Sequence, residues 1–265
     1  MIKNIVLLGG KRRSGKDHSG ALLIDRFGFH RVSYGNALKT IIYSVLDISF
    51  ERGDQMKNDN HIAKVEYGYF NNTLIKAIYD MNDSDYVLEK KSIENLKENL
   101  DNIIQKYVFI DGQAELINMT ADLLAAGKCE QVSIGIDLHM NVRMALQHIA
   151  SMFKEIFDPE IWTRICLHQI LNCEFDNVVA TDFRFPYEDF RHMPEAKDLN
   201  IITVGVIGKN RYDYDPVLDI HESETSLNDY HFDYALNNTV YSEDDIVLTV
   251  QLKSILKERG VEWMI

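Results

Sequence analysis

The chain has 265 residues, of which 46% are hydrophobic and 26% are charged, and its formal net charge at pH 7 is −13. This composition is typical of a globular protein with a large core. The acidic balance argues against a nucleic-acid polymer as partner, because binding a phosphate backbone calls for a basic surface. No apolar run reaches the ~20 residues of a membrane span. The 3 cysteines lack C-x-x-C spacing, so we expect a cytoplasmic protein with reduced thiols.

The first predicted element is a short buried strand, Ile5-Val6-Leu7-Leu8, followed by a glycine loop and a helix. The loop reads Gly10-Lys11-Arg12-Arg13-Ser14-Gly15-Lys16-Asp17, which has the G-x-x-x-x-G-K spacing of a phosphate-binding loop. Glycines let successive backbone N–H groups face one anion, and the positive end of the helix points there too. Lys16 adds a mobile charge for the outer phosphates. The alternative is a glycine turn that only happens to carry lysines, but the flanking strand and helix favour phosphate binding.

One position departs from the usual loop, because Asp17 stands where a magnesium-binding Ser or Thr is normal. A carboxylate can still hold the metal, directly or through water, and we keep both options. Four cationic residues lie around this position in an otherwise acidic chain: Lys11, Arg12, Arg13 and Lys16. Their place inside a glycine loop favours phosphate contact over a merely solvated face.

A second strand is expected at residues 29–34, followed by a helix with apolar residues at a period near 3.6. Lys39 lies near the start of this helix, where it either reaches a ligand beyond the strand or is simply solvated. From about residue 47 to 135 the pattern changes, and residues 52–60 are polar without periodicity. Later in this stretch, helices are expected after Ser92 and over residues 114–126. We interpret 48–135 as a mostly helical insertion within one domain, 1–265, that shapes the pocket for a second substrate.

Residues 141–157 form a strongly amphipathic helix, with Arg143 and Gln147 outside its apolar face. The sequence Asp158-Pro159-Glu160 then starts a new helix that carries Trp162. The next buried strand, residues 177–181, ends in Asp182-Phe183-Arg184. Ligands of open parallel sheets bind beyond the carboxyl ends of strands, and residues two apart face the same side. We therefore expect Asp182 and Arg184 to serve one site, with a local ion pair as the alternative.

The remaining pattern completes the sheet. A continuous apolar strand is expected at residues 201–207, a polar lid with Lys209 and Arg211 at 208–216, and a short strand at 232–236. The last helix is expected to begin after Ser242 as its N-cap, with Asp245 in its first turn. Strands starting near residues 4, 30, 177, 201 and 232 alternate with helices. This predicts an α/β fold with a five-stranded parallel sheet covered by helices on both faces.

At this point the sequence resembles a known family. The stretch from Gly10 to Asp17, Lys-Asp ending included, resembles the G-x-K-R-x-S-G-K-D loop of bacteriophage deoxynucleoside monophosphate kinases. Four further blocks match in the family's order: 145–147 through 161–162, 181–188, 221–227 and 232–238. Animal-type phosphomevalonate kinases share the loop and similar later blocks, so their activity is kept as an alternative.

The resemblance implies a P-loop, nucleoside monophosphate kinase-like fold. It also implies transfer of the ATP γ-phosphoryl group to a deoxynucleoside 5′-monophosphate, with ATP and Mg²⁺ as cofactors. The residues it assigns to the phosphate donor are Gly10, Lys11, Arg12, Arg13, Ser14, Gly15, Lys16, Asp17 and His18. The catalytic residues it implies are Lys16, Arg13, Asp17, Asp182 and Arg184. The metal is assigned to Asp17 and Asp182, directly or through water.

On the acceptor side, the resemblance implies that Arg143 grips the monophosphate and that Trp162 stacks on its base, unless Trp162 belongs to the core. Glu222 or Glu224 would orient the lid or the sugar. The whole implied acceptor set is Lys39, Arg143, Gln147, Trp162, Asp182, Arg184, Glu188, Glu222 and Glu224.

Two other functional classes stay open: a P-loop ATPase acting on a macromolecule, and a nucleotide-binding module without transfer. The acidic charge and the lack of an apolar strand ending in Asp-Glu argue against the ATPase. The expected partners are small nucleotides, without a nucleic-acid polymer or a membrane. A homodimer is left open, and a phage-encoded chain would work in the host-cell cytoplasm.

Overall fold

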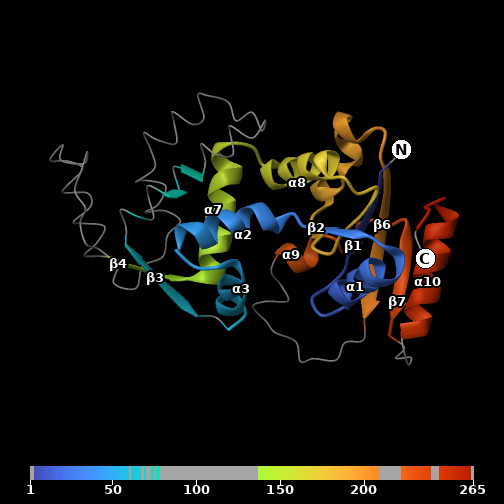
Figure 1. The fold of residues 1–265 in the computed structure, drawn as a ribbon, viewed down its shortest axis with the longest axis horizontal. Helices are drawn as coiled ribbons and strands as arrows, with labels where there is room; N and C mark the ends of the chain where they lie inside the picture. Colours follow the sequence, from blue (N-terminus) through green and yellow to red (C-terminus); the bar gives the residue numbers. More distant parts are fainter. Residues whose placement is uncertain are drawn as a thin grey trace. The chain divides into compact units, whose positions relative to one another are not determined.

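A computed structural model describes residues 3–59, 61–66, 69, 73–74, 76–77, 137–208, 222–239 and 245–263. The chain divides into two compact units, whose elements are labelled in Figure 1. One unit combines Met1–Gly35 with Trp162–Ile265, and the other is Asn36–Ile161. The second unit therefore interrupts the first in sequence, and the range 48–135 that was expected to be an insertion lies within it.

The first unit is built on a five-stranded sheet in which all neighbouring strands are parallel. In spatial order the strands are β2 (His30–Val32), β5 (Asn177–Ala180), β1 (Asn4–Gly9), β6 (Asn200–Gly208) and β7 (Tyr234–Asn238). The chain winds from β1 toward β2 on one side and from β6 toward β7 on the other. The winding direction thus reverses between β1 and β6, where open α/β sheets form a ligand crevice at the carboxyl ends of their strands. The predicted parallel fold is confirmed.

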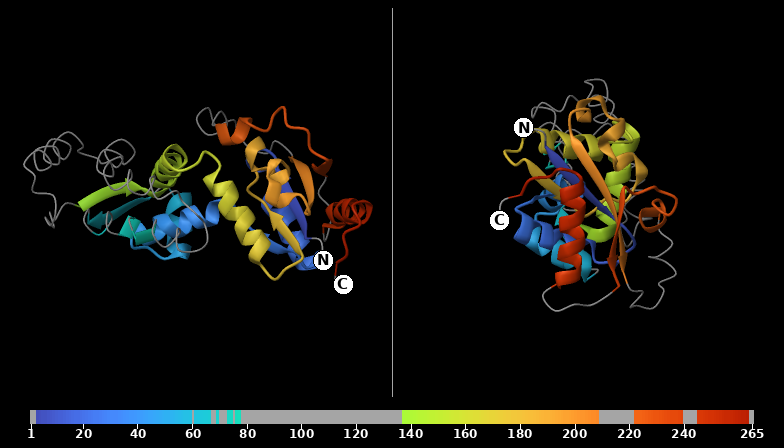
Figure 2. Two further views of the ribbon diagram at one scale, coloured as in Figure 1. Left: turned by 90° about the horizontal axis from the view of Figure 1, so that it is seen from above. Right: turned by 90° about the vertical axis from the view of Figure 1, so that its right-hand side faces the viewer.

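Helices cover both faces of this sheet, as predicted. Because alternate strand residues point to opposite faces, Leu7 joins the core that includes α8 (Ile161–Asn172). Leu8 joins the core formed with α1 (Lys16–Phe27) and α10 (Ile246–Glu258). Figure 2 shows α10 lying along the sheet. Burial on both faces explains why β1 is a continuous apolar run.

Short elements complete the first unit. Three 3-10 turns between β5 and β6 span Pro186–Glu188, Phe190–His192 and Pro194–Ala196. Phe190 lies in the core on the same face as α8. A one-turn helix, α9 (Glu222–Thr225), precedes β7.

The second unit contains three described helices and a strand pair. The helices are α2 (Gly35–Val45, whose first residue belongs to the first unit), α3 (Phe50–Asn58) and α7 (Val142–Ile156). Strand β3 (Ile62–Glu66) pairs antiparallel with β4 (Asp137–Asn141). The prediction of a mostly helical region did not include this pair, because its two strands lie far apart in sequence and give no local hairpin signal.

Helix α3 occupies most of residues 52–60, the stretch that is polar and without apolar periodicity in the sequence. Its N-cap, Ser49, accepts a hydrogen bond from the Arg52 amide at 3.2 Å. One of the buried residues of α3 is Gly53, where a Cβ would meet the Tyr43 ring at 2.6 Å. A glycine packed against an aromatic ring adds nothing to an apolar period, and this is why the periodicity was missed.

The last helix also begins later than expected. Asp245, placed in its first turn by the sequence, instead occupies the N-cap position of α10 with φ 54° and makes no side-chain cap. Several predictions lie outside the described residues: the Ser242 cap, the helices after Ser92 and at 114–126, and the lid cations Lys209 and Arg211. Within the described part of the chain, no helix combines the length and apolar character needed to span a bilayer.

Candidate functional site at the carboxyl edge of the sheet

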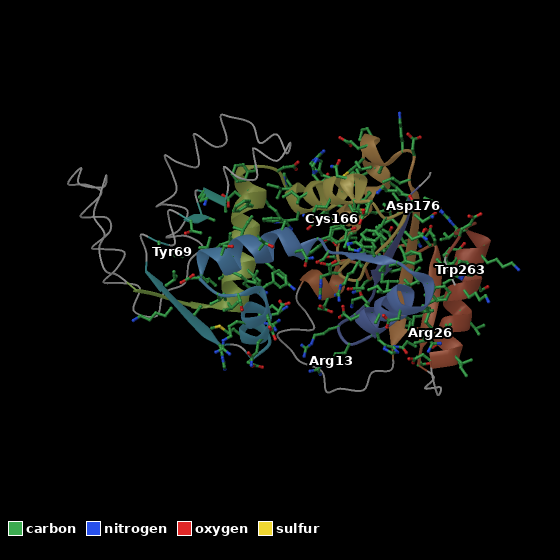
Figure 3. The ribbon with its side chains drawn as sticks, in the orientation of Figure 1. Arg13, Arg26, Tyr69, Cys166, Asp176 and Trp263 are labelled. Atoms are coloured by element: carbon green, nitrogen blue, oxygen red, sulfur yellow. The ribbon has the colours of Figure 1, made fainter. Side chains whose placement is uncertain are left out.

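The glycine loop (residues 10–17) connects β1 to α1 at the carboxyl edge of the sheet. Its backbone turns through three residues with positive φ: Gly10 at 138°, Arg13 at 63° and Gly15 at 98°. Arg13 is labelled in Figure 3. Gly10 and Gly15 thus occupy conformations that L side chains rarely adopt. The backbone of the loop thus turns at both glycines of the motif.

Neighbouring strands hold this loop closely. A Cβ on Gly10 would meet the Val206 carbonyl oxygen at 2.6 Å, and one on Gly15 would meet the Asn238 amide nitrogen at 2.0 Å. Asn238, at the end of β7, donates a hydrogen bond to the Ser14 carbonyl at 2.9 Å. The ends of β6 and β7 therefore set the position of the loop.

Lys16 is the most buried cation of the loop, with 6% of its surface exposed. Its ammonium donates hydrogen bonds to the carbonyl oxygens of Gly10 at 2.5 Å and Lys11 at 2.8 Å. Burial, aided by the nearby charge of Arg184, lowers the pKa of Lys16 to about 8, although Glu224 and Asp17 act in the opposite direction. The loop thus holds a buried ammonium that loses its proton near pH 8.

The loop also contains a buried hydroxyl without a partner. Ser14 is 6% exposed, and its Oγ has no hydrogen-bond partner within the described structure. Next to it, Gly15 is the N-cap of α1 and offers no side-chain cap to the amides of the first helical turn. Buried polar groups are normally satisfied, and uncapped helix amides attract anions. These features fit a bound phosphate group.

Asp17 is tied to the ends of two strands. Its Oδ1 accepts hydrogen bonds from the Thr181 hydroxyl at 2.8 Å and from Arg31 at 2.9 Å. The Asp17 side chain is nonetheless 78% exposed. Asp17 can therefore still offer a carboxylate oxygen to a cation held by phosphates.

Among the described residues, Asp182 and Arg184 bind different partners. The Asp182 carboxylate accepts hydrogen bonds from the Ser33 hydroxyl at 2.6 Å and from the amides of Tyr34 at 3.3 Å and Gly35 at 3.1 Å. The negative charge of Asp182 also interacts favourably with the positive end of the α2 helix dipole. Asp182 thus fixes the turn between β2 and α2, while Arg184 reaches elsewhere.

Arg184 pairs with Glu224 of α9. The other carboxylate oxygen of Glu224 accepts a hydrogen bond from the backbone amide of Arg12. Glu188, predicted at the acceptor site, is buried and accepts hydrogen bonds from the amides of Arg184 at 2.6 Å and Phe185 at 3.0 Å. Glu188 therefore holds the backbone that carries Arg184.

The second unit contains a cationic cluster of its own, formed by Lys39, Lys57 and Arg143 around Asp54. Asp54 lies 3.0 Å from the Lys39 ammonium and 3.5 Å from that of Lys57, and it accepts a hydrogen bond from the Tyr43 hydroxyl at 2.8 Å. Arg143 donates to the Lys57 carbonyl oxygen at 3.3 Å. Two lysines thus pair with the Asp54 carboxylate, and Arg143 lies beside Lys57.

Burial and neighbouring charges shift the pKa values of two groups in this cluster. Burial and then the charge of Lys39 lower the pKa of Lys57, with Arg143 adding to the effect and Asp54 opposing it. Burial alone would raise the pKa of Asp54, but hydrogen bonds from Lys39 and Tyr43 and the charges of both lysines lower it.

The other predicted residues are less involved. Trp162 is 7% exposed, which fits a core residue better than an open base-stacking surface. His18 pairs with Asp245 at 2.9 Å, and Gln147 is exposed on α7. The side chain of Glu222 is not among those that the structure describes.

Sequence reasoning missed four residues of these sites: Arg31, Asp54, Lys57 and Asn238. Asp54 and Lys57 lie three apart, a spacing that places them on one helix face, but the sequence around them shows no helical periodicity. Arg31 and Asn238 reach the loop with their side chains because strand pairing brings distant segments together, and this leaves no local signal in the sequence.

No group of three or more His, Cys, Asp or Glu side chains within the described ranges is placed to hold a metal ion. Magnesium often takes only one or two carboxylates, with phosphates and water as the remaining ligands. Asp17 fits that role because it is exposed, whereas Asp182 already receives three hydrogen bonds. The residues present therefore fit the ion through Asp17.

Fold and loop together define the class: an α/β protein of the phosphate-loop kinase type, with a parallel sheet and a glycine loop between its first strand and helix. A family model described as "Deoxynucleotide monophosphate kinase" matches residues 4–245. The chain belongs to this family and is a kinase of nucleotide metabolism. No curated protein is similar enough in sequence to count as a match.

Proposed function

We propose that the protein transfers the γ-phosphoryl group of ATP to a deoxynucleoside 5′-monophosphate and forms the diphosphate. The observation that carries this proposal is the glycine loop, with the buried Lys16 ammonium, the unpartnered Ser14 hydroxyl and the uncapped start of α1. Phosphoryl transfer needs positioning and neutralisation of charge more than covalent catalysis. The loop supplies both.

On the donor side, the amides at the start of α1 and the Lys16 ammonium bind the outer phosphates of ATP. To do so, Lys16 exchanges its carbonyl acceptors for phosphate oxygens, which are stronger partners because they are charged. Arg13 and Arg184 provide guanidinium groups for the charge that develops on the transferred group. Asp182 acts by positioning the start of α2.

Asp17 holds the Mg²⁺ ion, directly or through water. The ion supplies charge neutralisation on the donor phosphates. Thr181 and Arg31 orient the Asp17 carboxylate through their hydrogen bonds.

On the acceptor side, we assign the 5′-phosphate to the cationic cluster of Lys39, Lys57 and Arg143. Lysine and arginine side chains are the usual partners of a phosphate dianion. Asp54 keeps the lysine ammonium groups oriented.

The proposal is tested by ADP release from ATP and Mg²⁺, with each deoxynucleoside monophosphate, each ribonucleoside monophosphate and mevalonate 5-phosphate offered separately. We expect stimulation by one or more deoxynucleotides. If only mevalonate 5-phosphate stimulates ADP release, the substrate is mevalonate 5-phosphate and not a deoxynucleotide. ADP release that ignores every acceptor would indicate an ATPase.

A further inference from the structure

Glu224 makes an unusual contact for an acid beside a glycine loop. Its side chain is 8% exposed, and its two carboxylate oxygens have different partners. One oxygen accepts from the backbone amide of Arg12 within the loop, and the other accepts from the Arg184 guanidinium. Both belong to the part of the first unit where the loop, β5 and α9 meet.

The two donors that Glu224 uses are of the kind that bind phosphate oxygens. Loop amides and arginine forks are the standard partners of phosphate groups. Glu224 also acts on Lys16, whose pKa it raises against the larger effects of burial and Arg184. The carboxylate is therefore near three groups to which a phosphate would be attracted.

We propose that Glu224 is an internal anion that competes with the outer phosphates of the donor nucleotide for the Arg12 amide and Arg184. This inference rests on the proposed function, because it concerns the same loop. Binding of the nucleotide then requires the carboxylate to release at least one of these donors. Because Glu224 belongs to α9, binding of a nucleotide in the loop would also change the position of α9.

The competition has a definite electrostatic sign. A carboxylate and a phosphate close together repel each other, and the repulsion is strong where water is scarce. Removing the charge while keeping the shape should therefore strengthen nucleotide binding. If Glu224 instead served only to position Arg184 for the nucleotide, the same change would weaken binding.

The test is calorimetric titration with ATP and Mg²⁺ at pH 6.5, well below the Lys16 pKa of about 8. Wild type is compared with Glu224→Gln, which keeps the shape, and with Glu195→Gln. Glu195 is an exposed acid in the 3-10 turns, so its variant controls for the same change in net charge. We expect about tenfold tighter binding for Glu224→Gln and unchanged binding for the control. Unchanged or weaker binding by Glu224→Gln would overturn the inference, whereas a wild type that binds no ATP would overturn the proposed function itself.

A second measurement needs no variant. Hydrogen exchange of the backbone amides at residues 222–225 is followed in the wild type with and without ATP and Mg²⁺. Release of Glu224 predicts faster exchange in α9 once the nucleotide binds. Slower or unchanged exchange would contradict the competition.

Discussion

Lys16 is the residue whose charge depends most on its surroundings. Its pKa is lowered to about 8, chiefly by burial, so the ammonium is lost at lower pH than for an ordinary lysine. Because phosphate binding needs the ammonium, kcat/KM for ATP should fall above about pH 8, by roughly tenfold per pH unit. This alkaline limb, the fall of kcat/KM at high pH, is measured from kcat/KM for ATP against pH at a saturating concentration of the acceptor.

The Lys16→Arg variant is the control for that profile, because a guanidinium stays protonated over the whole range. Whatever activity the variant retains should lack the alkaline limb. A wild-type profile that stays flat to about pH 9.5 would contradict the role of Lys16.

Lys57 offers a second test on single residues. Lys57→Ala removes one of three cations from the cluster around Asp54. We expect KM for the monophosphate to rise by at least about tenfold, equivalent to ~1.4 kcal/mol, while KM for ATP changes little.

Arg52→Ala is the matched control, since Arg52 lies on the same helix and loses the same charge, but it is exposed and bonds Gln55. A Lys57→Ala enzyme with the same KM for the acceptor as Arg52→Ala would remove the cluster from the acceptor site.

The elements that could be predicted are those whose buried residues form a local apolar pattern in the sequence. β1 and β6 are buried on both faces and are continuous apolar runs, and α7 carries a clear apolar face. The position of the loop between a strand and a helix followed from the same pattern.

The elements that were missed depend on contacts between distant segments. α3 packs through Gly53 on Tyr43, and β3 pairs with a strand far along the chain. The same limit applies to the site. Asp182 and Arg184 lie two apart at one strand end, but the β2–α2 turn binds the first and Glu224 binds the second. Spacing predicted their location, while their partners required the tertiary structure.

The loop geometry itself can be tested by adding one methyl group. At Gly10, φ is 138° and a Cβ would meet the Val206 carbonyl oxygen at 2.6 Å. Gly28 is the control, since its φ is 69° but nothing lies within 4 Å of its Cβ position. Gly28→Ala should lower the free energy of unfolding by about 1–2 kcal/mol, the cost of the left-handed conformation. Gly10→Ala should cost clearly more, and urea unfolding measures both variants. Equal costs would mean that the loop has room to move.

At the scale of the whole molecule, an acidic chain with a net charge of −13 binds an anionic substrate through local fields. The glycine loop concentrates positive charge in the first unit, and the cluster around Asp54 does so in the second. In the proposed reaction, the loop takes the donor phosphates and the cluster takes the acceptor phosphate. These assignments predict that loss of Lys16 weakens the use of ATP, whereas loss of Lys57 weakens the use of the monophosphate.

The most direct test of the proposed reaction follows the phosphoryl group itself. The protein is incubated with ATP labelled at the γ-phosphate, Mg²⁺ and a deoxynucleoside monophosphate, and the products are separated by chromatography. The proposed mechanism predicts label in the deoxynucleoside diphosphate, and loss of that transfer in a folded Lys16→Ala variant. Label recovered only as inorganic phosphate, or equal transfer by Lys16→Ala, would contradict it.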